Sequence, residues 1–209
     1  MMRSLATLVL ASAAYGFTIG ASNSWLFATR NLVKFPLLIL STAAVCALAY
    51  FVLARFLGAP LSFVRVQRLV LAVFRDTSLL LASLGSVVLF FGLTMLRPTA
   101  ADLNDYPLFQ GLNVAWIAVC GCLAVRRQAA VLLRDHALAP PLRRGLVAGW
   151  MLLSLFAGGQ CAWYMRPFFG IAPPGPGGVP FFMGTQPDFR GARSLYEAVY
   201  NLIVLPSRR

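Results

Sequence analysis

The stretch FPLLILSTAAVCALAYFVLA, from Phe35 to Ala54, decides the fold. It contains no charged residue and lies between Lys34 and Arg55. A helix needs about 20 predominantly apolar residues to cross the hydrocarbon core of a bilayer, and this stretch has that length. It therefore predicts a transmembrane helix.

The composition of the whole chain points in the same direction. Of its 209 residues, 59% are hydrophobic and 11% are charged, whereas a soluble domain carries about 25% charged residues. A chain with so little charge cannot cover a water-facing surface, so it must face lipid. We expect an all-α, polytopic helical membrane bundle of about five spans. The predicted spans are residues 5–27, 35–54, 77–95, 107–125 and 145–165.

Small residues recur at helical spacing in two of these spans. Gly16 and Gly20 form one such pair, and Gly145 and Gly149 form another. Small residues four apart let helix backbones approach closely in lipid. We therefore expect these pairs to mediate self-association or contact with another membrane protein.

Residues Ser62 to Asp76 form a basic amphipathic segment before the third span. Arg65, Arg68 and Arg75 fall on one helical face, and apolar residues cover much of the rest. The pattern predicts a helix on the cytoplasmic surface, or a basic extension of the next span. We expect these three arginines to contact anionic lipid headgroups.

The net charge of +12 comes almost entirely from arginines at the ends of apolar segments. That placement favours a role in topology and in attraction to anionic lipid, and it argues against nucleic acid as a partner. The loops before the third and fifth spans hold most of these arginines. They predict a cytoplasmic N-terminus and a C-terminal segment on the outside.

The C-terminal region changes character after the fifth span. Residues 167–191 are rich in Gly and Pro and predict an external loop. Residues 192–209 regain helical periodicity but are too short to span, so we expect an interfacial helix and a tail.

A polar face marks the predicted outer end of the last span. Gln160, Trp163 and Arg166 are spaced by three, so they share one helix face. Gln110 and Asn113 lie at a similar depth on the fourth span. The candidate site is therefore a cluster of these five residues, which could hold a ligand or a partner.

This cluster has two interpretations. It could hold the Gly/Pro-rich segment over the outer mouth of the bundle as a lid or docking surface, with Asp102 or Asp105 as the counter-charge of Arg166. Alternatively, the amides join helices, while Trp163 and Arg166 anchor the membrane boundary.

Enzyme and cofactor signatures are missing from the sequence. The centres of the predicted spans carry no charged residue, which argues against a proton-coupled transporter. No serine lies in a nucleophile elbow, and no glycine-rich stretch forms a phosphate loop. Cys120 and Cys122 point to nearly opposite sides of a helix, which is poor geometry for a shared metal ion, so we expect no metal site. Because the other motifs are missing, we also expect no cofactor and no catalytic residue.

The motif Gln160-x-x-Trp163-x-x-Arg166-Pro167-Phe168-x-Gly170 resembles a group of uncharacterised bacterial multi-pass inner-membrane proteins. The order of loop, Ser62-Phe63 and basic helix is also similar in layout to Yip1-type five-helix proteins. The resemblance implies an architecture and an inner-membrane location, and it implies no chemistry.

Two functions from different classes fit these observations. The first is a non-enzymatic scaffold or partner-binding subunit of a membrane complex. The alternative is a transport or lipid-handling protein with a polar ligand site at the outer ends of the fourth and fifth spans.

Overall fold

The computed structural model describes residues 2–95, 105–134, 138–168, 180–184, 192–197 and 200, and within these ranges the regular structure is helical. Four helices are long and apolar enough to cross a membrane, and the bent pair α3 and α4 raises the number of possible spans to five. The fold is therefore that of a helical, multi-pass membrane protein. The helices are α1 (Met2–Ala21), α2 (Trp25–Phe56), α3 (Phe63–Ser83), α4 (Gly85–Met95), α5 (Asp105–Leu132) and α6 (Pro140–Met165).

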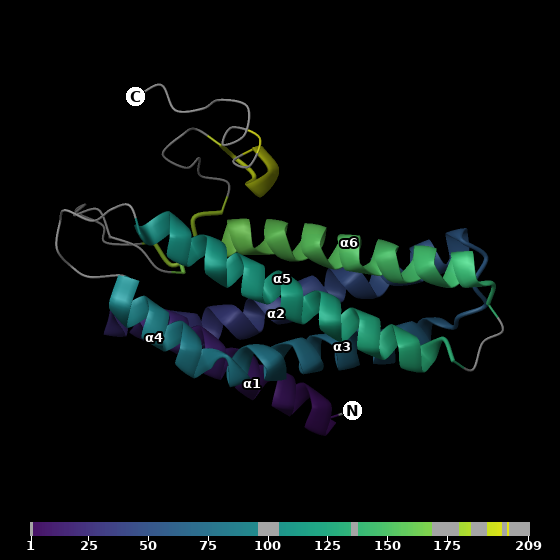
Figure 1. The fold of residues 1–209 in the computed structure, drawn as a ribbon, viewed down its shortest axis with the longest axis horizontal. Coiled ribbons are helices and arrows are strands. Elements are labelled where there is room, and N and C mark those ends of the chain that lie inside the picture. The colour runs from purple at the N-terminus through teal and green to yellow at the C-terminus, as the bar shows by residue number, and fades with distance from the viewer. Residues whose placement is uncertain are drawn as a thin grey trace.

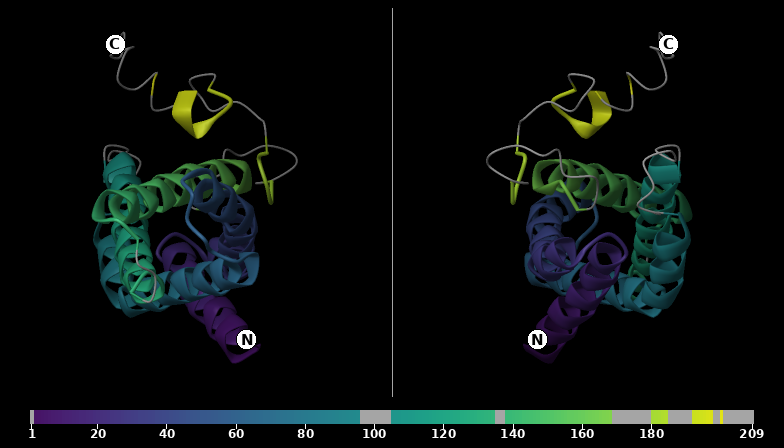
Figure 2. Two further views of the ribbon diagram at one scale, coloured as in Figure 1. Left: turned by 90° about the vertical axis from the view of Figure 1, so that its right-hand side faces the viewer. Right: turned by 90° about the vertical axis from the view of Figure 1, so that its left-hand side faces the viewer.

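The helices lie side by side along one long axis (Figure 1), and the end views show them around a common centre (Figure 2). α1 packs against α2, α3 and α4, while α6 packs against α2 and α5. We call the end with the α1–α2 turn the outer end, and the end with the α2–α3 connection the inner end, following the predicted orientation.

The first predicted span, residues 5–27, is too long. α1 ends at Ala21, and a turn over residues 22–24 leads directly into α2. The side chain of Ser24 accepts a hydrogen bond from the backbone N–H of Phe27 (3.3 Å), which caps α2. A serine cap of this kind satisfies a free N–H group at the start of a helix, so the short polar turn interrupts an otherwise uncharged run.

The loop expected around Arg30 and Lys34 is also wrong, because both residues lie inside α2. Pro36, near the start of the predicted span 35–54, lies within this helix of 32 residues. At 1.5 Å per residue α2 is about 48 Å long, well beyond a hydrocarbon core of about 30 Å.

The small-residue ridge of α1 is used inside the chain. A Cβ atom on Gly16 would lie 2.4 Å from the carbonyl oxygen of Asn31, and one on Gly20 would lie 2.3 Å from that of Phe27. α1 and α2 therefore touch backbone to backbone along this ridge. In the other pair, Gly149 packs against Leu53 of α2, whereas Gly145 has open space around it.

The basic segment and the third span share one helix. α3 runs through the expected boundary at residue 76, and the break comes at Leu84, where α4 turns away by 51°. Arg65 and Arg68 are exposed on α3, opposite a buried apolar face that includes Val66 and Val70.

Two charged residues are buried directly before predicted spans, at the edges of the runs 35–54 and 77–95. Lys34 of α2 has no exposed surface, and Asp76 of α3 is 7% exposed. The centres of the predicted spans themselves contain no charged residue.

The last two long helices agree more closely with the expected spans. α5 ends at Leu132, and α6 starts at Pro140, so Pro140-Pro141 opens the helix instead of preceding it, as suits proline in a first helical turn. In the C-terminal region, a short helical turn covers residues 195–197. Most of the predicted loop 167–191 and of the segment 192–209 lies outside the described residues.

Candidate functional site

The predicted outer cluster separates into two groups. Asn113 is buried and accepts a hydrogen bond from the hydroxyl of Tyr15 (3.2 Å), so it joins α5 to α1. Its amide nitrogen donates to the carbonyl oxygen of Phe109 (2.8 Å). Gln110 is exposed, and the buried Oε1 atom of Gln160 has no hydrogen-bond partner among the described residues. Asn113 therefore acts as an interhelical link, apart from the other predicted residues.

Trp163 and Arg166 come together and contact the C-terminal segment. The guanidinium carbon of Arg166 lies 3.6 Å from the centroid of the Trp163 ring. The indole Nε1 of Trp163 donates to the carbonyl oxygen of Arg193 (3.0 Å). The backbone N–H of Met183 donates to the carbonyl oxygen of Arg166 (2.8 Å). This end of α6 is therefore tied to the segment that follows it; Asp102 and the side chain of Asp105, the expected counter-charges, lie outside the described residues.

The centre of this region is Lys34, which sequence reasoning placed in a loop. Its Nζ atom donates to the carbonyl oxygen of Pro167 (2.7 Å). The rings of Phe168, Phe181 and Phe182 lie around the ammonium group, with centroids 5.7, 5.0 and 5.5 Å from Nζ. We call this arrangement the Lys34 site.

The Lys34 site provides more hydrogen-bond donors than acceptors. An ammonium group has three N–H donors, and within the described structure Lys34 finds one oxygen acceptor and no carboxylate. Each ring face adds about 0.5–2 kcal/mol of cation–π attraction, the larger value applying where water is excluded. Burying a charge without an opposite charge costs much more than burying a paired one. The site is therefore electropositive and suited to an anionic oxygen.

Neighbouring contacts fix the position of the segment over Lys34. Asn31, one turn earlier on α2, donates from Nδ2 to the carbonyl oxygen of Phe168 (2.5 Å). The Phe168 ring packs edge-on against Phe35 (5.3 Å between centroids), and Phe35 packs against Tyr15 (5.2 Å). The segment that covers Lys34 is thus continuous with the core between α1 and α2.

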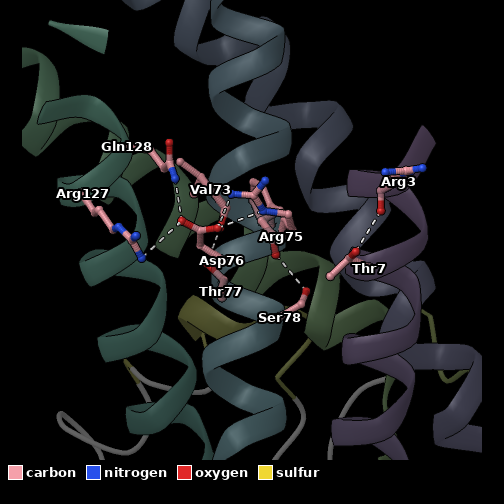
Figure 3. Close-up of polar contacts among 10 residues, drawn as sticks. Arg3, Thr7, Val73, Arg75, Asp76, Thr77, Ser78, Arg127 and Gln128 are labelled. Carbon is pink, nitrogen blue, oxygen red and sulfur yellow. Dashed lines mark hydrogen bonds and ion pairs between the residues drawn. The ribbon is translucent and has the colours of Figure 1, made fainter. Parts of the chain in front are cut away.

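A second polar group lies at the inner end, centred on Asp76 of α3 (Figure 3). Arg75 contacts its Oδ1 atom through Nε (3.0 Å) and Nη2 (2.7 Å). From α5, the amide of Gln128 donates to Oδ2 (2.5 Å), and Nη1 of Arg127 lies 4.0 Å from the same oxygen. We call these four residues the Asp76 cluster. In the sequence, the one sign of this cluster is that Asp76 is a single carboxylate at the start of an apolar run.

A further contact between residues distant in sequence links α2 to α6. Tyr50 of α2 stacks on Trp150 of α6 with ring centroids 5.2 Å apart. The indole N–H of Trp150 donates to the carbonyl oxygen of Tyr50 (3.2 Å), and the Tyr50 hydroxyl pairs with Ser154. These contacts join α2 to α6.

No group of His, Cys, Asp and Glu side chains in the described part of the chain could hold a metal ion. Comparisons with known protein families, with curated proteins and with solved structures find no match. The function must therefore be inferred from the two polar sites.

Proposed function

We propose that the protein is a transport or lipid-handling protein of a bacterial inner membrane that binds an anionic group at Lys34. The observation that carries this proposal is the complete burial of Lys34 without a carboxylate partner in the described structure. Ionisable residues inside membrane bundles are costly and usually serve a ligand or ion pathway.

The carbonyl oxygen of Pro167 occupies the place that a ligand oxygen would take. It lies 2.7 Å from Nζ, which is the distance of a charge-assisted hydrogen bond. A neutral carbonyl is a weaker partner for an ammonium group than a carboxylate or phosphate oxygen. An anionic ligand therefore has an energetic advantage over the chain's own backbone at this position.

Access to Lys34 requires the covering segment to move. Its described parts, residues 167–168 and 180–184, are held by individual hydrogen bonds, including those from Asn31 and Lys34. A hydrogen bond between neutral groups contributes about 0.5–1.5 kcal/mol net, and one from a charged group such as the Lys34 ammonium about 1.5–3 kcal/mol. We expect the segment to act as a lid that a ligand displaces.

The chain offers a direct probe of burial, because Lys34 is its only lysine. An amine-reactive ester should label Lys34 much more slowly in the folded protein than in the denatured protein at the same pH. Fast labelling of Lys34 in the folded protein would mean that it is not covered.

Binding is tested with short-chain phosphatidic acid, short-chain phosphatidylcholine and inorganic phosphate, using the melting temperature of the detergent-purified protein. Phosphatidic acid should stabilise the parent protein, and this gain should be reduced in Lys34→Met, which keeps an unbranched apolar side chain. Stabilisation by inorganic phosphate as well would identify a free anion as the ligand. Equal gains in the parent and in Lys34→Met would overturn the proposal.

The other function expected from the sequence is that of a scaffold or partner-binding subunit. Purification in mild detergent distinguishes it from ligand binding at Lys34. A stoichiometric second protein that remains bound to Lys34→Met as well as to the parent would favour it. No contact among the described residues supports it in the way that Lys34 supports ligand binding.

A further inference from the structure

The Asp76 cluster contains two guanidinium groups and one carboxylate. The Asp76 side chain is 9% exposed, while that of Arg75 is 33% exposed and that of Arg127 is 79% exposed. The negative charge therefore lies inside the bundle, and the positive charges lie at its surface. One carboxylate against two guanidinium groups leaves a net charge of +1.

Asp76 holds the two arginines in different ways. Its Oδ1 atom accepts two hydrogen bonds from Arg75, which fixes the plane of that guanidinium group. Nη1 of Arg127 lies 4.0 Å from Oδ2, which is an ion pair but too long for a hydrogen bond. Gln128 completes the coordination of Oδ2 and links α3 to α5. Figure 3 shows these side chains meeting between the two helices.

The predicted spans place the cluster at the depth of lipid headgroups. Asp76 directly precedes the predicted span 77–95, and Arg127 and Gln128 directly follow the predicted span 107–125. Both helices therefore bring these residues to the same boundary, which the distribution of arginines predicts to be cytoplasmic. Phosphate groups of the inner leaflet lie at this level.

Apolar side chains continue each helix face toward the membrane centre. Leu80 lies one turn deeper than Asp76 on α3 and is 38% exposed. Leu123 lies one turn deeper than Arg127 on α5 and is 52% exposed. Residues four apart share a helix face, so each face has a charge at headgroup level and an exposed leucine below it. A phospholipid has the same order of phosphate and acyl chain.

We propose that the Asp76 cluster is a binding site for the phosphate of an anionic phospholipid in the inner leaflet. Arg75 and Arg127 bind the phosphate, whose oxygens match the paired N–H donors of a guanidinium group. Asp76 is a positioning residue, and Leu80 and Leu123 lie along the acyl chains. This proposal does not depend on ligand binding at Lys34. The Lys34 site lies toward the outer end of the bundle, whereas the Asp76 cluster lies toward its inner end.

The site is tested by matched arginine variants of the full chain. Arg126 and Arg127 are adjacent, exposed residues of α5, but only Arg127 pairs with Asp76. Arg126→Gln and Arg127→Gln therefore remove the same charge at the same depth. The readout is binding of phosphatidylglycerol, against phosphatidylcholine, to the detergent-purified protein by native mass spectrometry.

We expect Arg127→Gln to weaken phosphatidylglycerol binding about fivefold, the effect of one arginine near an anionic surface, and Arg126→Gln to leave it nearly unchanged. Asp76→Asn should act in the same direction as Arg127→Gln, and size-exclusion chromatography would show whether that variant is folded. Should it fail to fold, the arginine pair still decides the outcome.

Equal losses in both arginine variants would mean diffuse attraction to the membrane and would overturn the proposal. Competition by free glycerol phosphate at concentrations similar to those of the lipid would identify a soluble anion as the ligand, and would overturn the assignment to a phospholipid.

Discussion

Replacing Gly20 by alanine tests the contact on which the packing of α1 depends. The added Cβ atom would lie 2.3 Å from the carbonyl oxygen of Phe27, 2.4 Å from its carbonyl carbon and 2.5 Å from the amide nitrogen of Ala28. All three atoms are backbone, so no side-chain rotation relieves the clash. Since attractive contacts lie at about 3.5–4 Å, α1 and α2 would have to separate by roughly 1 Å.

The change in the free energy of unfolding caused by Gly20→Ala can be estimated from two opposing effects. Inserting a methyl group into a well-packed contact costs about 1–3 kcal/mol. Alanine is favoured over glycine within a helix by about 0.5–1 kcal/mol. Gly20→Ala should therefore lower the free energy of unfolding by about 1–2 kcal/mol.

Gly145 provides the matched control, because a Cβ atom there meets nothing within 4 Å. Gly145→Ala should gain only the helical preference and raise the melting temperature slightly. The assay is thermal unfolding of the detergent-purified protein, followed by tryptophan fluorescence. For a chain of this size 1 kcal/mol corresponds to about 2–4 °C. If both alanine variants melt at the same temperature or above the parent, then α1 and α2 are not in backbone contact.

Three further predictions concern topology and polar contacts. Reporter fusions should read cytoplasmic after Ala59 and Ala137 and external after Ala101; the same side for the last two would disprove five spans. Tyr15→Phe should destabilise the protein by about 0.6 kcal/mol, the average of interhelical polar contacts in membranes, because it loses the bond to Asn113; an unchanged melting temperature would refute this. Arg166→Ala should speed protease cleavage of the C-terminal segment from outside, since the stacking on Trp163 is lost; equal cleavage in the parent would assign Arg166 to a boundary anchor.

The helical, multi-pass type of the fold could be predicted from the sequence because each apolar run carries its own signal. Uncharged runs of about 20 residues are local features, and α2, α5 and α6 follow from them. The errors lie where a short feature ends a helix within an apolar run. The turn at residues 22–24 separates α1 from α2, and the break at Leu84 falls inside an uncharged stretch.

The two polar sites could not be predicted in the same way, because their partners are distant in sequence. A lysine at the edge of an apolar run has the pattern of a loop residue. Lys34 is buried by a carbonyl group 133 positions later in the chain. Asp76 is likewise satisfied by Gln128, which lies 52 positions away. Local hydropathy contains no information about either contact, so only the packing of the helices reveals them.

The choice of cation at each end supports a difference in chemistry between the two sites. Lysine carries a compact charge that a single oxygen and several ring faces can surround, whereas arginine presents a planar pair of donors. The buried outer site uses the only lysine, with one carbonyl oxygen and three phenylalanine rings around it. The inner site uses Arg75 and Arg127, which both pair with Asp76. An arginine in place of Lys34 would bring five N–H donors into a site with one described acceptor, so Lys34→Arg should destabilise the closed lid even though it keeps the charge.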